Sequence, residues 1–363
     1  MPTRKSSAFR SLHWLPFLAA GLTGLYFLLI TGYALMQGVQ LTQESRQREV
    51  QAWADLKPLQ RENLSSLEII RQKGLLSRGT CLAFSPSGHL LASGSDAADV
   101  TVFDSLTGAR LRRYASTGGY VLDTAFSPDE TVLATAEWNG TIRLWGMAET
   151  GLIGVLNGHS AEVNALAFHP NGNWLASGGG DSALLLWNWR EQQVLRAEKM
   201  NAVVGAVAFS PDGRLLAAGD MTGALWLWSE IETQNEPRCR WQHPGGVSDI
   251  RFSADSRTVY AAGGASISRW NAEDCSLIGL FSTPESQPLL KMALSPDERL
   301  LAGCGGRWRE PHLWIWTLPE GNAVLAGAFP SRVEVVRDLL FDPTGRALLT
   351  VSHDGQIRWW GVR

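Results

Sequence analysis

The chain has 363 residues, of which 45% are hydrophobic and 18% charged, and its formal net charge is −3. This composition is typical of a folded protein and excludes an intrinsically disordered chain. The basic residues form no stripe and the net charge is weakly negative, so we expect no nucleic-acid partner.

The first element in the chain is an uncharged apolar segment, residues 14–36, WLPFLAAGLTGLYFLLITGYALM. As a helix it would measure about 34 Å, enough to cross a hydrocarbon core of about 30 Å. Basic residues precede it at Arg4, Lys5 and Arg10. The positive-inside rule therefore places residues 1–13 in the cytoplasm as a short tail and the rest of the chain on the far side of the membrane, which is the periplasm in a bacterium.

A cleavable signal peptide is the alternative for this segment. Its apolar region would be about 7–15 residues long and would end in a small-x-small site, whereas GYALMQG offers a poor cleavage site. We therefore predict a retained single-pass anchor. Small residues in GLTG and GYALMQG leave open that the helix also assembles with other membrane helices.

A polar segment follows, and we assign residues 37–65 to a helical stalk or linker. The part from Gln37 to Lys57 permits a helix but has few apolar positions to bury, and Pro58 ends the helical pattern.

From residue 66 to residue 363 the chain repeats one pattern seven times. Examples are AFSPSGHLLASGS (83–95) and AFHPNGNWLASGG (167–179), in which a strand, a tight turn and a second strand follow one another. A period in the low forties is typical of a unit of four strands. The recurring anchor positions are Phe84, Phe126, Phe168, Phe209, Phe252, Leu294 and Phe341. One aromatic residue ends the third strand of each unit: Phe103, Trp145, Trp187, Trp228, Trp270, Trp316 and Trp360.

This pattern resembles the WD-repeat family, whose members fold as β-propellers. The resemblance covers residues 66–363 and implies an all-β fold, a seven-bladed β-propeller of four-stranded antiparallel blades, behind the N-terminal transmembrane α-helix and stalk. The chain ends after three strands of the last blade, and an open sheet edge is unfavourable. We therefore expect residues 67–72 to pair with residues 356–360 and close the ring.

One repeat contains the residue types of a hydrolase triad, His159, Ser177 and Asp181. The resemblance implies instead a structural network, in which these three side chains and Trp187 form hydrogen bonds inside one blade. A nucleophilic serine needs exposure, an oxyanion hole and usually a Gly-x-Ser-x-Gly elbow. Because Ser177 lies inside a predicted strand, we predict the structural network and no catalytic residue.

No motif in the chain indicates a metal, a cofactor or a phosphate site. The four cysteines, Cys81, Cys239, Cys275 and Cys304, contain no Cys-x-x-Cys pair. We expect small buried or half-buried thiols, and one disulfide is the alternative in an oxidising compartment.

Two groups of residues are candidates for binding a partner at one rim of the propeller. The third position of the first strand could hold a small residue, but four repeats have a charged residue there, which we place around one mouth of the channel: Asp123, Asp249, Lys291 and Asp338. Simple solvation in a wet channel is the alternative for these four. The second group comes from loops and strand ends of the same rim: Tyr120, Trp138, Trp308, Arg309, Arg337 and His353.

These observations predict a membrane-anchored WD-repeat scaffold that binds one or more proteins through the propeller rim and has no catalytic activity of its own. The alternative is a propeller whose channel mouth binds a ligand or an ion and acts as a sensor or an enzyme.

Overall fold

The computed structural model describes residues 46–363 except 149–150, 232–235, 308–309, 319–322 and 329–334. The chain divides into two compact units, residues 1–54 and residues 55–363. In the first unit, residues 46–54 are helical. The predicted tail and the predicted membrane segment lie outside the described residues. Within the part of the chain that the structure describes, no helix has the length and apolar character needed to cross a bilayer.

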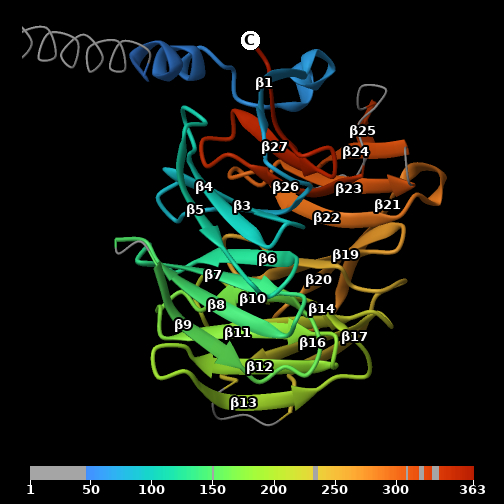
Figure 1. The fold of residues 1–363 in the computed structure, drawn as a ribbon. Coiled ribbons are helices and arrows are strands. Elements are labelled where there is room, and N and C mark those ends of the chain that lie inside the picture. The colour runs from blue at the N-terminus through green and yellow to red at the C-terminus, as the bar shows by residue number, and fades with distance from the viewer. Residues whose placement is uncertain (1–45, 149–150, 232–235, 308–309, 319–322, 329–334) are drawn as a thin grey trace, which may run out of the picture. The chain divides into compact units, whose positions relative to one another are not determined.

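The second unit is a seven-bladed propeller of four-stranded antiparallel sheets, as predicted (Figure 1). Blade 1 contains β2 (Gly79–Phe84), β3 (Leu90–Ser95), β4 (Asp99–Asp104) and β5 (Arg110–Ala115); blade 2 contains β6 (Val121–Phe126), β7 (Val132–Glu137), β8 (Thr141–Gly146) and β9 (Gly151–Asn157). Blade 3 contains β10 (Val163–Phe168), β11 (Trp174–Gly179), β12 (Ala183–Asn188) and β13 (Gln193–Lys199); blade 4 contains β14 (Val204–Phe209), β15 (Leu215–Asp220), β16 (Ala224–Ser229) and β17 (Cys239–Gln242). Blade 5 contains β18 (Asp249–Phe252), β19 (Thr258–Gly263), β20 (Ser266–Asn271) and β21 (Leu277–Ser282); blade 6 contains β22 (Leu289–Leu294), β23 (Leu300–Arg307), β24 (Glu310–Thr317) and β25 (Ala323–Ala328). Blade 7 contains β26 (Val336–Phe341), β27 (Ala347–Ser352), β28 (Gln356–Gly361) and, as its outer strand, β1 (Glu68–Gly74).

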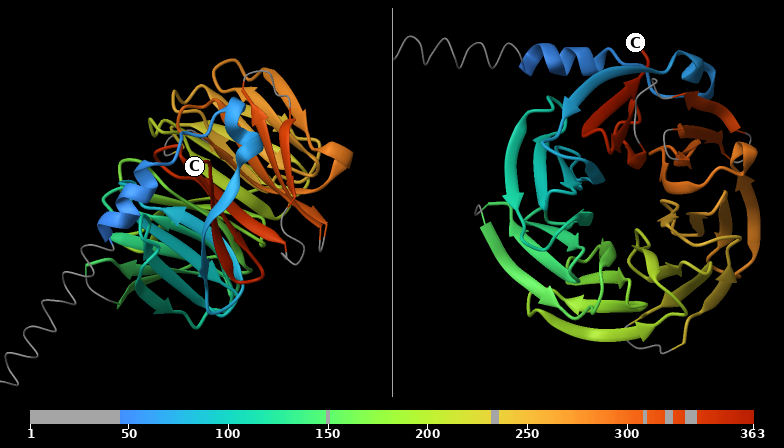
Figure 2. Two further views of the ribbon diagram at one scale, coloured as in Figure 1. Left: turned by 90° about the horizontal axis from the view of Figure 1, so that it is seen from above. Right: turned by 45° about the vertical axis from the view of Figure 1, so that its right-hand side comes forward.

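The blades are arranged in a ring with the first strand of each blade innermost (Figure 2). Because the strands alternate in direction, the turns between second and third strands and the loops leading into each first strand lie on the same edge of the ring. We call this edge the upper rim, and the opposite edge the lower rim.

The ring closes between the two ends of the propeller sequence. Strand β1 pairs with β28 in antiparallel register from Glu68↔Gly361 to Gly74↔Gln356, which confirms the predicted closure. Two short 3-10 helices, η1 (Arg61–Ser66) and η2 (Pro284–Ser286), lie outside the blades. The linker before β1 also docks on the ring, because the Leu59 N–H donates to the Gly345 carbonyl.

Apolar side chains from neighbouring blades form the core. The aromatic residue that ends the third strand is fully buried in several blades, as with Trp187, Trp228 and Trp316. Leu59 and Leu64 of the linker join the cluster between blades 6 and 7. Residues 55–65, which the sequence assigned to the stalk, therefore belong to the same compact unit as the propeller.

Two of the four cysteines form a disulfide. Cys239 at the start of β17 bonds to Cys275 in the β20–β21 turn, with 5.7 Å between their Cα atoms and 36 positions between them in sequence. The expectation of four unpaired thiols is therefore wrong for this pair, whereas Cys81 and Cys304 are free and buried. The disulfide joins blade 4 to blade 5 at the lower rim.

Candidate functional site: the upper rim and the channel

The His159 set forms a continuous hydrogen-bonded network inside blade 3. The Trp187 indole N–H donates to Ser177 Oγ at 2.8 Å, and Ser177 Oγ lies 2.7 Å from His159 Nε2. His159 Nδ1 lies 3.0 Å from the Asp181 carboxylate. One assignment of protons satisfies every atom: Ser177 donates to Nε2, and Nδ1–H donates to Asp181.

The burial of its side chains distinguishes this network from a catalytic triad. Ser177 is 0% exposed and the His159 side chain is 0% exposed, so no substrate atom can reach the hydroxyl. Burial raises the pKa of Asp181, but hydrogen bonds from the Ser160 N–H and from His159 outweigh it, and the pKa is lowered overall. The charged carboxylate thus orients the imidazole within the blade.

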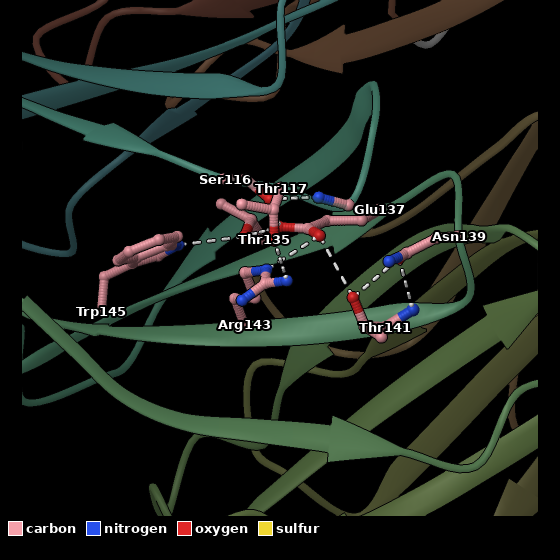
Figure 3. A network of polar contacts seen from close by, with 9 residues as sticks. Ser116, Thr117, Thr135, Glu137, Asn139, Thr141, Arg143 and Trp145 are labelled. Carbon is pink, nitrogen blue, oxygen red and sulfur yellow. Dashed lines mark hydrogen bonds and ion pairs between the residues drawn. The ribbon is translucent and has the colours of Figure 1, made fainter.

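Blade 2 replaces the histidine with a buried glutamate (Figure 3). Glu137 is 0% exposed and accepts hydrogen bonds from Arg143 Nε at 3.0 Å and from Thr141 Oγ1 at 3.1 Å. The Trp145 indole donates to Thr135 Oγ1 at 3.0 Å. The sequence pattern missed Glu137, because its carboxylate comes from the end of the second strand and not from the preceding loop.

Blade 5 has a third version of the network. His243 Nδ1 lies 2.8 Å from Ser268 Oγ, and the Trp270 indole donates to the same oxygen at 2.9 Å. Burial lowers the pKa of His243. Ser268 lies two residues before Trp270 on β20, a spacing that could have indicated it.

Three of the predicted rim acids are bound into the seams between blades. One oxygen of each carboxylate accepts an N–H from the first strand of the next blade, at 2.8 Å for Asp123 and Leu166, 2.9 Å for Asp249 and Met292, and 2.8 Å for Asp338 and Leu82. The other oxygen accepts the N–H of the following residue in the same strand. These acids therefore act first as fasteners between blades.

The same acids line the lower part of the channel, a cavity of about 490 Å³, together with Arg251 and Lys291. Burial raises the pKa of Asp338 to about 6, although the charges of Lys291 and Arg251 oppose this rise. Burial also raises the pKa of Asp123, although the charge of Lys291 opposes this rise. Burial would lower the pKa of Lys291, but the charges of Asp249, Asp123 and Asp338 outweigh it, so the pKa is raised and Lys291 is protonated.

The upper mouth of the channel is a second cavity, of about 320 Å³. Each blade contributes one residue from the start of its first strand, which is the second strand residue except for Ser248, the residue just before β18: Thr80, Leu122, Asn164, Gly205, Ser248, Leu290 and Arg337. Lys291, Glu162, Val203 and Met221 complete the lining. Of the predicted rim residues, Lys291 and Arg337 thus meet at this mouth.

An exposed aromatic pair lies on the upper rim at blade 2. Tyr120 is 50% exposed and Trp138 is 57% exposed, and their ring centroids are 6.1 Å apart. His353 is half-buried at the equivalent turn of blade 7. Trp308 and Arg309, the other two predicted rim residues, lie outside the described residues.

Metal chemistry finds no support in the described part of the chain, where no group of three or more His, Cys, Asp or Glu side chains could hold a metal ion.

Comparison with known proteins identifies the repeats. The family described as WD domain, G-beta repeat, matches residues 79–104, 108–146, 150–188, 189–229 and 324–361, about half of the chain. The chain belongs to the WD40-repeat family. Blade 5 and the first three strands of blade 6 fall outside these WD40 matches, yet both blades have the same four-stranded form.

Several WD40 relatives share part of the propeller. The periodic tryptophan protein 2 homolog of Schizosaccharomyces pombe is 32% identical over 114 residues, which are 31% of this chain and 13% of that protein. The WD repeat and SOCS box-containing protein 1 of Homo sapiens is 34% identical over 101 residues, 27% of this chain and 24% of that protein. The small ribosomal subunit protein RACK1y of Oryza sativa subsp. japonica is 34% identical over 79 residues, 21% of this chain and 24% of that protein. The chain thus spans less than a quarter of the length of each of these three relatives.

Proposed function

We propose that this WD40 propeller is a membrane-tethered scaffold that binds a partner protein on its upper rim and performs no catalysis of its own. The observation that carries the proposal is the exposed pair of Tyr120 and Trp138 on the upper rim at blade 2. Large aromatic side chains are enriched among the residues that dominate binding energy at protein interfaces. The relatives, among them a SOCS box-containing protein and a ribosomal subunit protein, support an interaction role.

Among the described residues, no side-chain hydrogen bond involves either ring of the aromatic pair. Trp145, seven residues after Trp138, is buried and bonded within the blade 2 network, whereas Trp138 lies outside that network. Burying two such rings in an interface gains a few kcal/mol, at about 25 cal/mol per Å² of apolar surface.

The membrane tether is proposed from the uncharged segment 14–36 and the basic residues before it. The Cys239–Cys275 disulfide supports the proposed topology independently, because structural disulfides persist in oxidising compartments and are rare in the cytosol. We therefore place the propeller on the non-cytoplasmic side, which is the periplasm in a bacterium.

A ligand-binding or catalytic channel is the competing function. The cavity of about 490 Å³ is large enough for a small molecule, which favours that function. Against it, the carboxylates of Asp123, Asp249 and Asp338 already accept two backbone hydrogen bonds each. The hydroxyl of Ser177 is buried in its own network.

The experiment is a crosslinked pull-down from membranes, quantified by mass spectrometry for the wild type and for Tyr120→Ala/Trp138→Ala. We expect specific partners to be lost from the double variant and kept by Leu152→Ala, a control that removes an equally exposed apolar side chain from the outer strand β9. If the double variant captured the same partners as the wild type, binding through the upper rim would be refuted. If the protein were found in the soluble fraction, membrane tethering would be refuted.

A further inference from the structure

Two cationic side chains lie together where blades 6 and 7 meet the upper mouth. Lys291 is the third residue of β22 and Arg337 is the second residue of β26, and both line the cavity of about 320 Å³. Strands β22 and β26 are the innermost strands of consecutive blades and pack against each other.

Both cations keep donors available toward the mouth. Among the described residues, the Arg337 side chain has no hydrogen bond or ion pair, and its Nε is buried without a partner. The side chain of Lys291 has no hydrogen bond or ion pair to a described residue either, although the charges of Asp249, Asp123 and Asp338 raise its pKa. In each of these acids, both carboxylate oxygens accept backbone N–H groups. The acids therefore offset the charge of Lys291 without accepting hydrogen bonds from its three N–H donors.

The opposite side of the mouth is apolar and weakly acidic. Leu122 of blade 2, Val203 before blade 4 and Met221 of blade 4, which is 47% exposed, line it. Glu162 of blade 3 also lines the cavity, across the ring from blades 6 and 7 (Figure 2). The mouth therefore has a cationic edge and an apolar edge, with one acid that repels anions from the apolar side.

We propose that the upper mouth binds an acidic segment of the partner protein, with an Asp or Glu carboxylate between Lys291 and Arg337 and a neighbouring aromatic or aliphatic side chain against Tyr120 and Trp138. A guanidinium can bind a carboxylate through two parallel hydrogen bonds, and a protonated lysine adds a third. This assignment rests on the proposed scaffold function and specifies the chemistry of its partner.

The test is a selection of phage-displayed random 12-residue peptides on the full-length protein in lipid nanodiscs. We expect the wild type to enrich peptides that carry Asp or Glu beside Trp, Phe or Leu. A synthetic peptide from that pool should bind Arg337→Gln at least about tenfold more weakly, because a charge-assisted hydrogen bond pair is lost. Its affinity for the wild type should also fall between 50 and 300 mM salt, as expected for an exposed charge pair screened over about 10 Å or less.

Arg214→Gln is the matched control, because Arg214 lies in the β14–β15 turn at the lower rim with its side chain 84% exposed. It should bind the peptide like the wild type, and thermal unfolding should show that Arg337→Gln and Lys291→Gln remain folded. Acidic peptides that bind these two folded variants as tightly as the wild type would overturn the proposal.

The outcomes separate this assignment from the scaffold function. Enriched peptides without an acidic preference, whose binding is lost in Trp138→Ala, would overturn the acidic assignment and leave the rim in place. Enriched peptides that depend on neither Arg337 nor Trp138, or no enrichment at all, would count against both.

Discussion

The raised pKa of Asp338 makes a quantitative prediction about the stability of the ring. The pKa is 3.8 in an unperturbed aspartate and about 6 in the folded protein, because burial in the channel disfavours the charged form. This difference of about two pKa units corresponds to about 3 kcal/mol. Since the folded state binds the proton more tightly, this contribution to stability is present below about pH 4 and is lost as the pH rises to about 6.

The perturbation is Asp338→Asn, which removes the titration and keeps one acceptor for the seam. Free energies of unfolding would be measured by urea titration at pH 4, 5, 6 and 7, using the fluorescence of the buried tryptophans. We expect the wild type to lose about 3 kcal/mol relative to the variant between pH 4 and pH 7. Only this difference between the two proteins matters, so a constant offset from the changed hydrogen bond does not affect the result.

Asp212→Asn is a control of opposite sign. Burial raises the pKa of Asp212, but hydrogen bonds from Ser210 and the Arg214 N–H outweigh it, so its pKa is lowered overall. Its contribution is therefore present at neutral pH and lost as the pH falls below the usual aspartate range. If the free energies of unfolding of Asp338→Asn and the wild type changed in parallel from pH 4 to pH 7, ionisation of Asp338 would not destabilise the folded ring.

Three further substitutions test the interactions inside and between blades. Ser177→Ala leaves the Trp187 indole N–H and His159 Nε2 without partners and should lower the free energy of unfolding by about 2–4 kcal/mol in a urea titration, with partner binding unchanged. Glu137→Ala should cost about 2–4 kcal/mol in the same assay, because it leaves the half-buried Arg143 guanidinium without its carboxylate partner. Cys275→Ser should cost about 4 kcal/mol, as expected for opening a loop of this length, and a reducing agent should have the same effect on the wild type but none on the variant.

The fold could be predicted because each repeat carries its own local signals. The anchor at Phe168 and the aromatic residue at Trp187 recur in every blade, and the missing outer strand of the last blade had to come from the other end of the repeats. The His159 network was also visible, because all four residues occupy the positions that the WD-repeat pattern assigns to them.

The site was less predictable, because its contacts join residues that no local pattern connects. Asp123 and Asp338 were predicted as partner-binding candidates around the channel mouth. Their carboxylates accept N–H groups from residues 43 and 256 positions away in the sequence. The pairing of Cys239 with Cys275 likewise depends on where two neighbouring blades bring a strand and a turn together. Ser268 and Glu137 were missed because a hydroxyl or a carboxylate can reach the same point in a blade from a different strand.

Side-chain hydrogen bonds between the first strands of neighbouring blades are present at some seams of the ring and absent at others. Polar side chains near the start of the first strand bond to the next blade at five seams, through Thr80, Asp123, Asn164, Asp249 and Asp338. In the described residues, no such bond joins β14 to β18 or β22 to β26.

Both of these seams have contacts outside the first strands. The seam between blades 4 and 5 carries the disulfide and the stacked rings of Trp241 and Trp270. The seam between blades 6 and 7 is filled by Leu59 and Leu64 of the linker that leads from the N-terminal unit. Lys291 stands at the position where other blades have a small or seam-forming residue. The cation that we propose for partner binding therefore lies at a seam without a side-chain bond between its first strands. The linker segment with Leu59 and Leu64 thus packs at the same seam between blades that carries the proposed acidic-peptide site.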